Sequence, residues 1–246
     1  MATETNKYAT QFLEKATPFS PHSRFRKWGE AGTRSEEMQA FVALQILMGL
    51  TQKNEIEDYW EQYHWTYAPF TEVMRRNQFE LLSSLLHFAD NREQRPPQDD
   101  PQFDHLWKIR PLLNIVEPLY LDAYTPKQKI FIDESICKFK GRLSFRQFLP
   151  NKPIRFGLKQ FVVYESQTGY AMKFLIYCGK GTDRTVHLED GFTMTETVCL
   201  DLLKEFRNYG HHVFMDKYYS FPKLFKKLEK DQIGACGTVK PERQNM

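Results

Sequence analysis

The apolar positions in the first part of the chain recur at the spacing of helices. Residues 38–50 carry apolar side chains on more than one side of such a helix, so it is expected to be buried on several sides. Thr33 and Glu36 precede it with the spacing of a capping box, which predicts that the helix begins there. A second helix is predicted over residues 70–88, where apolar and charged positions alternate with the same period. The chain therefore opens with a helical region.

Two polar stretches flank this helical region. The first, residues 1–25, contains two prolines and predicts a flexible lead-in. The second, residues 92–104, contains three prolines, which break helices and cannot donate to a strand ladder, and it predicts a linker. We therefore expect a helical domain over residues 26–91 and a second domain over residues 105–246.

Beyond the linker, a helical pattern over residues 106–121 gives way to short runs typical of strands. The five predicted strands cover residues 129–133, 156–165, 170–177, 211–215 and 233–239. Helical patterns over residues 195–209 and 221–230 separate the last three of them. The first three strands are joined by short connections, including a tight turn at residues 167–169, and helices and strands then alternate. This order predicts a mixed α/β domain with flanking helices.

Composition agrees with a folded, soluble chain. The 246 residues are 41% apolar and 15% aromatic, which is ample material for packed cores. No run approaches the roughly 20 apolar residues of a membrane span, and the first residues lack a secretory signal, so we expect an intracellular protein without a membrane partner. The four cysteines lie at least 20 residues apart, which matches neither a zinc module nor a disulfide framework, so no zinc is expected.

Two aspartates each follow three apolar residues at the predicted end of a strand. Asp133 follows residues 130–132, and Asp216 follows residues 213–215. If those strands are neighbours, the carboxylates lie side by side, where Mg²⁺ would relieve their repulsion and keep water positions for phosphate oxygens. A pair of such ions can activate a nucleophile for phosphodiester chemistry. Asp at a strand end is also a common turn or cap residue, so the spacing leaves both interpretations open.

A strongly basic stretch lies between these aspartates. Residues 135–164 contain no acidic side chain, although the net charge of the whole chain is only +3. Five phenylalanines are interleaved with seven cations, which are Lys138, Lys140, Arg142, Arg146, Lys152, Arg155 and Lys159. Such a stretch suits a phosphate backbone, with affinity that falls as salt rises, although a solvated strand face would have the same composition. Nucleic acid is therefore a candidate partner.

Other catalytic patterns are not found in the sequence. No cluster of His and Cys has the spacing of metal ligands, and Cys137 has no flanking His that would support a nucleophile. Residues 179–182 have the composition of a turn and lack the spacing of a phosphate-binding glycine loop. We therefore expect neither a catalytic histidine nor a small-molecule substrate.

A series of short motifs runs in order along residues 36–243. These motifs are Met48-Gly49-Leu50, Asp58-Tyr59-Trp60, MRRNQF at residues 74–79, LHFADN at 86–91, LWKIRP at 106–111, Asp133-Glu134-Ser135, FKGR at 139–142, Asn151-Lys152-Pro153, Gly169-Tyr170, MDKYYS at 215–220 and CGTV at 236–239. Each motif is short, but their number and order are specific. Together they resemble piggyBac-type transposases and the host proteins derived from them.

The resemblance implies an RNase H-like core that excises a DNA element and reinserts it at TTAA sites with an Asp triad and Mg²⁺. It implies that Asp133 and Asp216 are the first two catalytic and metal-binding residues of that triad. The basic stretch would then lie along the path of double-stranded DNA, and residues 26–91 would form a dimerisation and DNA-binding region. The family resemblance thus implies a nuclear protein, with a homodimer as one assembly.

The chain departs from the family after Asp216. In the family a third catalytic Asp follows an inserted domain, whereas only 30 residues follow Asp216 here, and the acids among them, Glu229, Asp231 and Glu242, match no such position. We therefore expect an incomplete RNase H-like sheet with a partly uncovered apolar face, and DNA binding without efficient strand transfer. Two alternatives stay open. One is an active transposase, either because an acid such as Glu134 substitutes or because the chain is a fragment of a longer product, and the other is a non-catalytic protein-interaction module.

Overall fold

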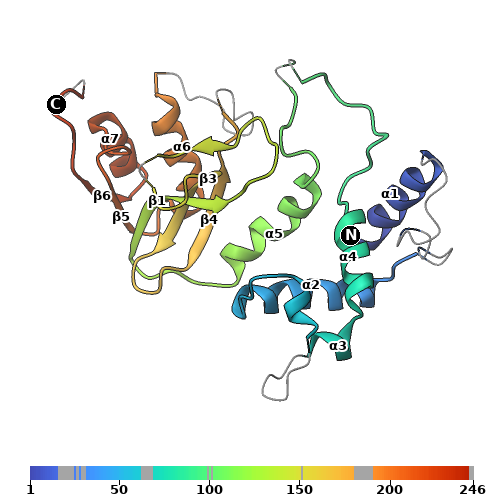
Figure 1. Ribbon diagram of the computed structural model, residues 1–246. Coiled ribbons are helices and arrows are strands. Elements are labelled where there is room, and N and C mark those ends of the chain that lie inside the picture. Colours follow the sequence, from blue (N-terminus) through green and yellow to red (C-terminus); the bar gives the residue numbers. More distant parts are fainter. Residues whose placement is uncertain are drawn as a thin grey trace. The chain divides into compact units, whose positions relative to one another are not determined.

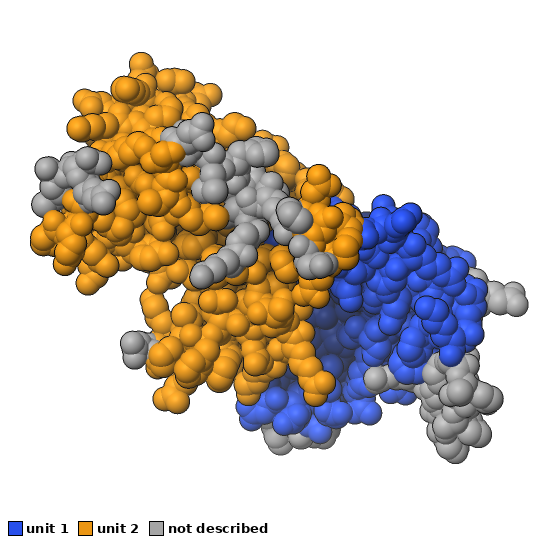
Figure 2. Space-filling model, turned by 90° about the horizontal axis from the view of Figure 1, so that it is seen from above, with its two compact units in different colours: residues 1–95, 106–112 blue, residues 96–105, 113–246 orange. Residues whose placement is uncertain are grey.

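The computed structural model describes residues 1–15, 25, 28, 32–61, 69–98, 100, 102–150, 152–179 and 191–243. Contacts along the chain divide it into two compact units, residues 1–95 with 106–112 and residues 96–105 with 113–246 (Figure 2). The chain first enters the second unit at residue 96, within the predicted linker, returns to the first unit at residue 106 and enters the second again at residue 113.

The first unit is built from helices (Figure 1). Its elements are α1 (Ala2–Lys15), α2 (Ser35–Leu50), the 3₁₀ turn η2 (Glu57–Tyr59), α3 (Phe70–Val73) and α4 (Arg76–Leu85). Phe41 of α2 and Phe79 of α4 are buried, with ring centroids 5.0 Å apart, and Trp60 packs on Phe79 at 5.1 Å. These aromatic contacts join α2 to α4 and form the core of the helical region that the spacing of apolar positions predicts.

The flexible lead-in expected over residues 1–25 is helical in its first part. α1 has Thr5 and Ala9 on one face, where both are fully buried, and Ala9 packs with two leucines of α4. The average polarity of this stretch conceals the buried face, because small and weakly polar residues form much of it. The expectation was therefore wrong for residues 2–15, and residues 16–24 lie outside the described residues.

The capping box expected from Thr33 and Glu36 does not form. α2 begins at Ser35, and the residue before it makes no side-chain cap. The Thr33 hydroxyl instead donates to Glu37 Oε2 at 2.7 Å. The spacing indicated the correct start of the helix to within two residues, but the carboxylate that reaches Thr33 lies one position further along.

The helix predicted over residues 70–88 is broken into α3 and α4. Met74, between the two, has an extended backbone with φ −155° and ψ 143°. Its carbonyl oxygen accepts a hydrogen bond from the Trp60 indole nitrogen at 2.7 Å. This tertiary bond satisfies a carbonyl that a continuous helix would have paired internally, so the interruption leaves that group satisfied.

The described part of the second unit contains a mixed sheet of six strands (Figure 1). The strands are β1 (Lys129–Lys138), β2 (Gln147–Phe148), β3 (Phe156–Glu165), β4 (Ala171–Ile176), β5 (His212–Met215) and β6 (Gly234–Gly237). The order is β2-β3-β1-β5-β6, and β4 also pairs with β3. β1 is antiparallel to β3 but parallel to β5, and β5 is parallel to β6. The predicted mixed α/β fold is confirmed, and only the two-residue strand β2 was not expected.

Helices accompany this sheet where the sequence predicts them. They are α5 (Arg110–Asp122), α6 (Met194–Leu202) with the short 3₁₀ turn η3 (Lys204–Phe206), and α7 (Pro222–Lys230). α5 begins in the first unit and ends in the second. Within the described ranges, no helix combines the length and the apolar character that crossing a bilayer requires.

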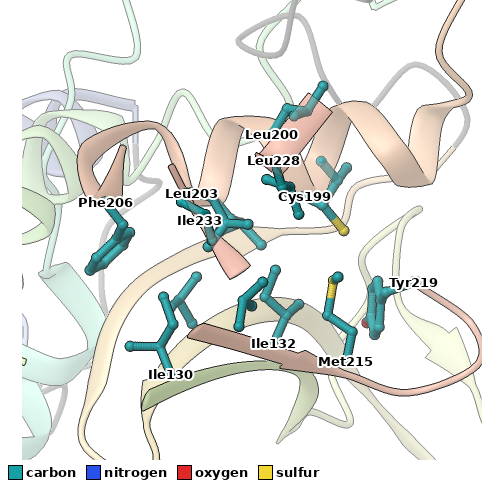
Figure 3. Close-up of a cluster of buried hydrophobic side chains, with 14 of the residues drawn as sticks. Ile130, Ile132, Cys199, Leu200, Leu203, Phe206, Met215, Tyr219, Leu228 and Ile233 are labelled. Atoms are coloured by element: carbon teal, nitrogen blue, oxygen red, sulfur yellow. The ribbon is translucent and has the colours of Figure 1, made fainter. Parts of the chain in front are cut away.

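One face of the sheet packs against α6 and α7 (Figure 3). Ile130 and Ile132 of β1 and Val213 and Met215 of β5 are buried there against leucines of the two helices. Burying a side chain of this size contributes about 1.5–3 kcal/mol relative to leaving it exposed. The cluster therefore determines which face of β1 and β5 is turned inward, and it opposes any shift of register between them.

β1 is longer than the sequence predicts. Its pairing with β3 runs from Ile130 opposite Glu165 to Lys138 opposite Gly157, so Asp133 lies in the middle of the strand rather than at its end. The residues after Asp133 are mostly polar and do not resemble a strand by composition. They are extended because β3 offers backbone partners along their whole length, and pairing outweighs local propensity.

A tight turn joins β3 to β4 at residues 167–169, as predicted. Gly169 has a φ of 71°, a left-handed conformation that glycine adopts readily, and its amide donates to the Glu165 carbonyl at 3.0 Å. The Glu165 carboxylate accepts three further hydrogen bonds through Oε2, from the amides of Gln167 and Thr168 and from the Thr168 hydroxyl, at 2.7–2.9 Å. Burial raises the pKa of this carboxyl, but the hydrogen bonds outweigh burial and hold its pKa below the usual value.

Replacing Glu165 by Gln should therefore destabilise the fold at neutral pH. A carboxyl whose pKa is lower in the folded chain stabilises the fold above its unfolded pKa of about 4.3, and this contribution is lost as the pH falls through the folded pKa. Urea unfolding followed by circular dichroism should show a deficit for Glu165→Gln at neutral pH that shrinks below pH ~4. The exposed Glu229→Gln serves as the control, and a deficit independent of pH would contradict the role of the charged carboxylate.

Candidate metal and nucleic-acid site

Asp133 and Asp216 lie level with each other on neighbouring parallel strands. The register of β1 and β5 places Ile132 opposite Met215; Asp133 follows Ile132 within β1, and Asp216 is the first residue after β5. Neighbouring strands are about 4.8 Å apart, so the backbones that carry the two carboxylates are adjacent. Both side chains are exposed. The sequence predicted these carboxylates side by side on the condition that their strands are neighbours, and the condition holds.

Hydrogen bonds orient one oxygen of each carboxylate. Asp133 Oδ1 accepts from the Glu134 amide at 2.8 Å, and Asp216 Oδ1 accepts from the Tyr218 amide at 2.7 Å. The main-chain carbonyl of Asp216 also accepts from the Ser220 amide and hydroxyl, at 3.2 and 2.8 Å. Asp216 is thus a turn residue as well as a candidate ligand. Within the described residues, the Oδ2 atom of each carboxylate has no hydrogen-bond partner and is available to a ligand.

A close backbone approach supports the turn after Asp216. Gly237 of β6 lies opposite Met215 of β5. A Cβ atom at Gly237 would collide with the Met215 carbonyl oxygen and with the Ser220 hydroxyl, so the position requires glycine. The glycine of the CGTV motif therefore allows β6 to pack against the start of the Asp216 turn.

A buried tyrosine connects this turn to β1. The Tyr219 hydroxyl donates to Glu134 Oε2 at 3.2 Å, and the Lys152 ammonium lies 3.5 Å from Glu134 Oε1. Tyr219 is fully buried, and this burial, followed by the negative charge of Glu134, raises the pKa of the phenol, which therefore remains a hydrogen-bond donor. The bond joins the residue after Asp133 to the third residue after Asp216. Sequence reasoning did not identify this pair, because its members lie 85 positions apart and only the MDKYYS motif marks Tyr219.

Glu134 does not lie with Asp133. Successive residues of a strand point to opposite faces, so Glu134 shares the face of Ile132, whereas Asp133 shares the opposite face with Phe131. The bond to the buried Tyr219 agrees with this orientation. The alternative in which Glu134 replaces a third acid therefore lacks geometric support.

The basic stretch forms the end of β1, the connection to β3 and all but the last residue of β3. Three of its seven cations have partners within the chain. Arg146 Nη1 donates to the carbonyls of Lys140 and Gly141 at 3.0 and 3.1 Å, Lys152 approaches Glu134, and the Lys159 ammonium lies 4.8 Å from the Phe161 ring centre. The other four, Lys138, Lys140, Arg142 and Arg155, are exposed, and their side chains have no ion-pair partner among the described residues. These four are the cations most available to a phosphate backbone.

The carboxylates at this site form a pair. Across the described ranges, no group of three or more His, Cys, Asp or Glu side chains is arranged to hold a metal ion. Two exposed carboxylates offer hard oxygen ligands, which suit Mg²⁺ because that ion commonly takes one or two carboxylates and keeps several waters. The donor set therefore fits a partly hydrated hard cation.

Comparison with known proteins identifies the family. A family model described as transposase IS4 matches residues 1–246. The chain belongs to this transposase family. Its piggyBac character is confirmed by two human relatives. PiggyBac transposable element-derived protein 2 is 29% identical over 219 residues, covering 85% of this chain and 34% of the relative, and PiggyBac transposable element-derived protein 3 is 29% identical over 214 residues, covering 86% and 35%.

A solved structure shares the fold of this transposase-family chain. The structure is titled as a cryo-EM structure of the piggyBac transposase synaptic complex with hairpin DNA, and it matches with a TM-score of 0.81 and 23% identity. The match covers 100% of this chain and 48% of the solved one. The chain thus spans about a third of the length of the curated relatives and about half of the solved transposase. The family expected from the ordered motifs is confirmed.

Replacing Tyr219 by Phe should destabilise the second unit of this transposase-family chain. The change removes the hydroxyl that bonds Glu134 but keeps the ring, so we expect a loss of about 1 kcal/mol in the free energy of unfolding. Urea denaturation followed by circular dichroism measures this loss. Tyr218→Phe is the matched control, since Tyr218 is 42% exposed and its ring still packs on Tyr219. An equal loss of stability in the two variants would show that the hydrogen bond between Tyr219 and Glu134 does not stabilise the fold.

Proposed function

We propose that this chain is a transposase-derived DNA-binding protein that holds a divalent cation at Asp133 and Asp216. The observation that carries the proposal is the level position of these two exposed carboxylates on parallel strands, next to a basic connection that begins on the same strand. In this proposal Asp133 and Asp216 are two of the three acids that the family resemblance implies, and the chain binds DNA without efficient strand transfer. A nuclear location is part of this proposal, since the proposed ligand is DNA.

The carboxylates would hold Mg²⁺ through their Oδ2 atoms. Their Oδ1 atoms are oriented by the amides of Glu134 and Tyr218, which leaves the second oxygen of each side chain for the ion. A bound Mg²⁺ would polarise a phosphodiester and lower the pKa of its water. The protein's own contribution is to position the two carboxylates. The parallel pairing of β1 and β5 and the Tyr219–Glu134 bond hold the two carboxylates level before any ion arrives.

The exposed cations would hold the phosphate backbone of double-stranded DNA. Lys138, Lys140, Arg142 and Arg155 carry no internal ion pair among the described residues, so binding DNA does not require breaking one. The solved transposase with the same fold is titled as a complex with hairpin DNA, which supports DNA as the ligand class. Association through phosphates releases counterions, so the affinity should fall linearly with salt on logarithmic axes.

A filter-binding titration against salt tests DNA binding. We expect Lys140→Gln, Arg142→Gln and Arg155→Gln together to weaken duplex binding and to reduce the salt slope by about one for each cation removed. The control is the triple variant Lys204→Gln, Lys230→Gln and Lys240→Gln, which removes the same charge from exposed positions elsewhere in the second unit. Absence of binding by the wild-type chain at low salt would refute the proposal. An equal loss in the control would refute the assignment to the basic connection.

Metal binding and catalysis are tested with Mn²⁺ as a spectroscopic substitute for Mg²⁺. Electron paramagnetic resonance should show Mn²⁺ binding that either Asp133→Asn or Asp216→Asn weakens by about tenfold or more, whereas the exposed Asp122→Asn has no effect.

The same proteins are then incubated with a TTAA-containing hairpin DNA. Nicking that depends on Asp133 would overturn the non-catalytic assignment and favour an active transposase. Mn²⁺ binding that is indifferent to both aspartates would overturn the metal site.

A further inference from the structure

Two phenylalanine rings lie on the surface of the basic connection. Phe148 is 59% exposed and Phe156 is 43% exposed, and their ring centroids are 4.8 Å apart. The pairing of β2 with the beginning of β3 places them opposite each other in register. Because both belong to a strand ladder, the pair presents one aromatic surface whose position is determined by the backbone.

Packing of the core does not explain this pair. Phe145, three residues before Phe148, is only 6% exposed and contacts the His105 ring edge-on, so the same segment already contributes a buried ring. Full burial of a Phe side chain contributes about 1.5–3 kcal/mol, which these two exposed rings largely forgo. Contiguous exposed apolar side chains of this kind typically mark a binding surface.

Cations accompany the two rings. The Arg146 guanidinium lies 5.1 Å from the centre of the Phe156 ring, and its bonds to the carbonyls of Lys140 and Gly141 hold it there. Arg155, immediately before Phe156, is exposed. The chain from residue 135 to residue 164 contains no acid. Flat apolar rings with only cations beside them along the chain suit a ligand that combines flat apolar groups with negative charge, and a nucleic-acid strand has both.

The aromatic pair shares a sheet face with Asp133. Asp133 lies opposite Val162 of β3, and side chains two residues apart on a strand point to the same face, so Phe156 lies on the face of Val162 and Asp133. Six residues of strand separate Val162 from Phe156, a distance of about 20 Å. A DNA strand that passes the carboxylates along β3 would therefore reach the aromatic pair without crossing to the other face of the sheet.

We propose that Phe148 and Phe156 form a stacking platform for unpaired bases of DNA. This inference rests on the proposed DNA-binding function and names the form of DNA that the surface selects. A base inside a duplex has both faces covered by its neighbours, whereas an unpaired base has a free face that can stack on Phe148. The neighbouring cations hold its phosphates. Stacking of this kind tolerates any sequence, because every base has a π face.

Fluorescence anisotropy with two probes tests the platform at one salt concentration. One probe is a fully paired duplex, and the other is the same duplex with a single-stranded extension that contains 2-aminopurine. We expect Phe148→Ala to weaken binding of the extended probe by about tenfold and to leave duplex binding and its salt slope nearly unchanged. The change in 2-aminopurine fluorescence on binding should be lost in Phe148→Ala and restored in Phe148→Trp, which retains an aromatic face.

Two further variants make the result specific. Phe148→Leu keeps an apolar side chain without a ring, so it should behave like the alanine variant if stacking is the cause. Tyr209→Ala removes an aromatic ring that is 77% exposed elsewhere in the second unit, and it should have no effect. Equal losses on both probes, or full binding of the extended probe by Phe148→Leu, would overturn the platform while leaving the proposed DNA-binding function intact. Failure of the wild-type chain to bind either probe would overturn both.

Discussion

The parallel pairing of β1 with β5 is the constraint on which the site depends. These strands are distant in sequence, and they are kept together by apolar side chains buried on one face under α6 and α7. Ile132 and Met215 are opposite each other and buried, so the residues that follow them, Asp133 in β1 and Asp216 directly after β5, lie next to each other. A shift by one residue would turn the apolar side chains outward, so the energetic cost of exposing the core also protects the geometry of the carboxylates. The relative position of the two carboxylates is well defined because the buried side chains oppose any shift of register between β1 and β5.

The sequence predicted the features of this arrangement that depend on residues close together in the chain, but not those that depend on distant residues. Three apolar residues before each aspartate are a local pattern, and they were enough to predict a strand before each carboxylate. The length of β1 was underestimated, because strand formation after Asp133 is imposed by β3 and the polar residues there give no sign of it. The Tyr219–Glu134 bond joins residues whose separation in sequence leaves no periodic signal. What escapes prediction here is long-range pairing, whether of backbones or of side chains.

Charge and polarity patterns were informative on average but not residue by residue. The basic stretch stood out by composition, yet composition could not show that Arg146 is held by main-chain carbonyls while Arg142 and Arg155 remain exposed. The same limit explains α1, where the mean polarity of residues 2–15 concealed a face on which Thr5 and Ala9 are buried. A helix needs only one apolar stripe, and small residues can form it when the partner surface, here α4, supplies the larger side chains.

The ion pairs around the site leave both the two aspartates and four of the exposed cations of the basic stretch without an internal partner of opposite charge among the described residues. Carboxylates and cations that share a strand and a loop would be expected to neutralise each other, which would weaken both metal and phosphate binding. Among the described residues, however, Lys152 pairs with Glu134, whose side chain lies on the face of β1 opposite Asp133. Among the described residues, neither Asp133 and Asp216 nor the four exposed cations form an ion pair. Alternation of side chains along β1 is sufficient for this separation. The Glu134 side chain points toward Lys152 and the core, whereas the side chain of its neighbour Asp133 points to solvent.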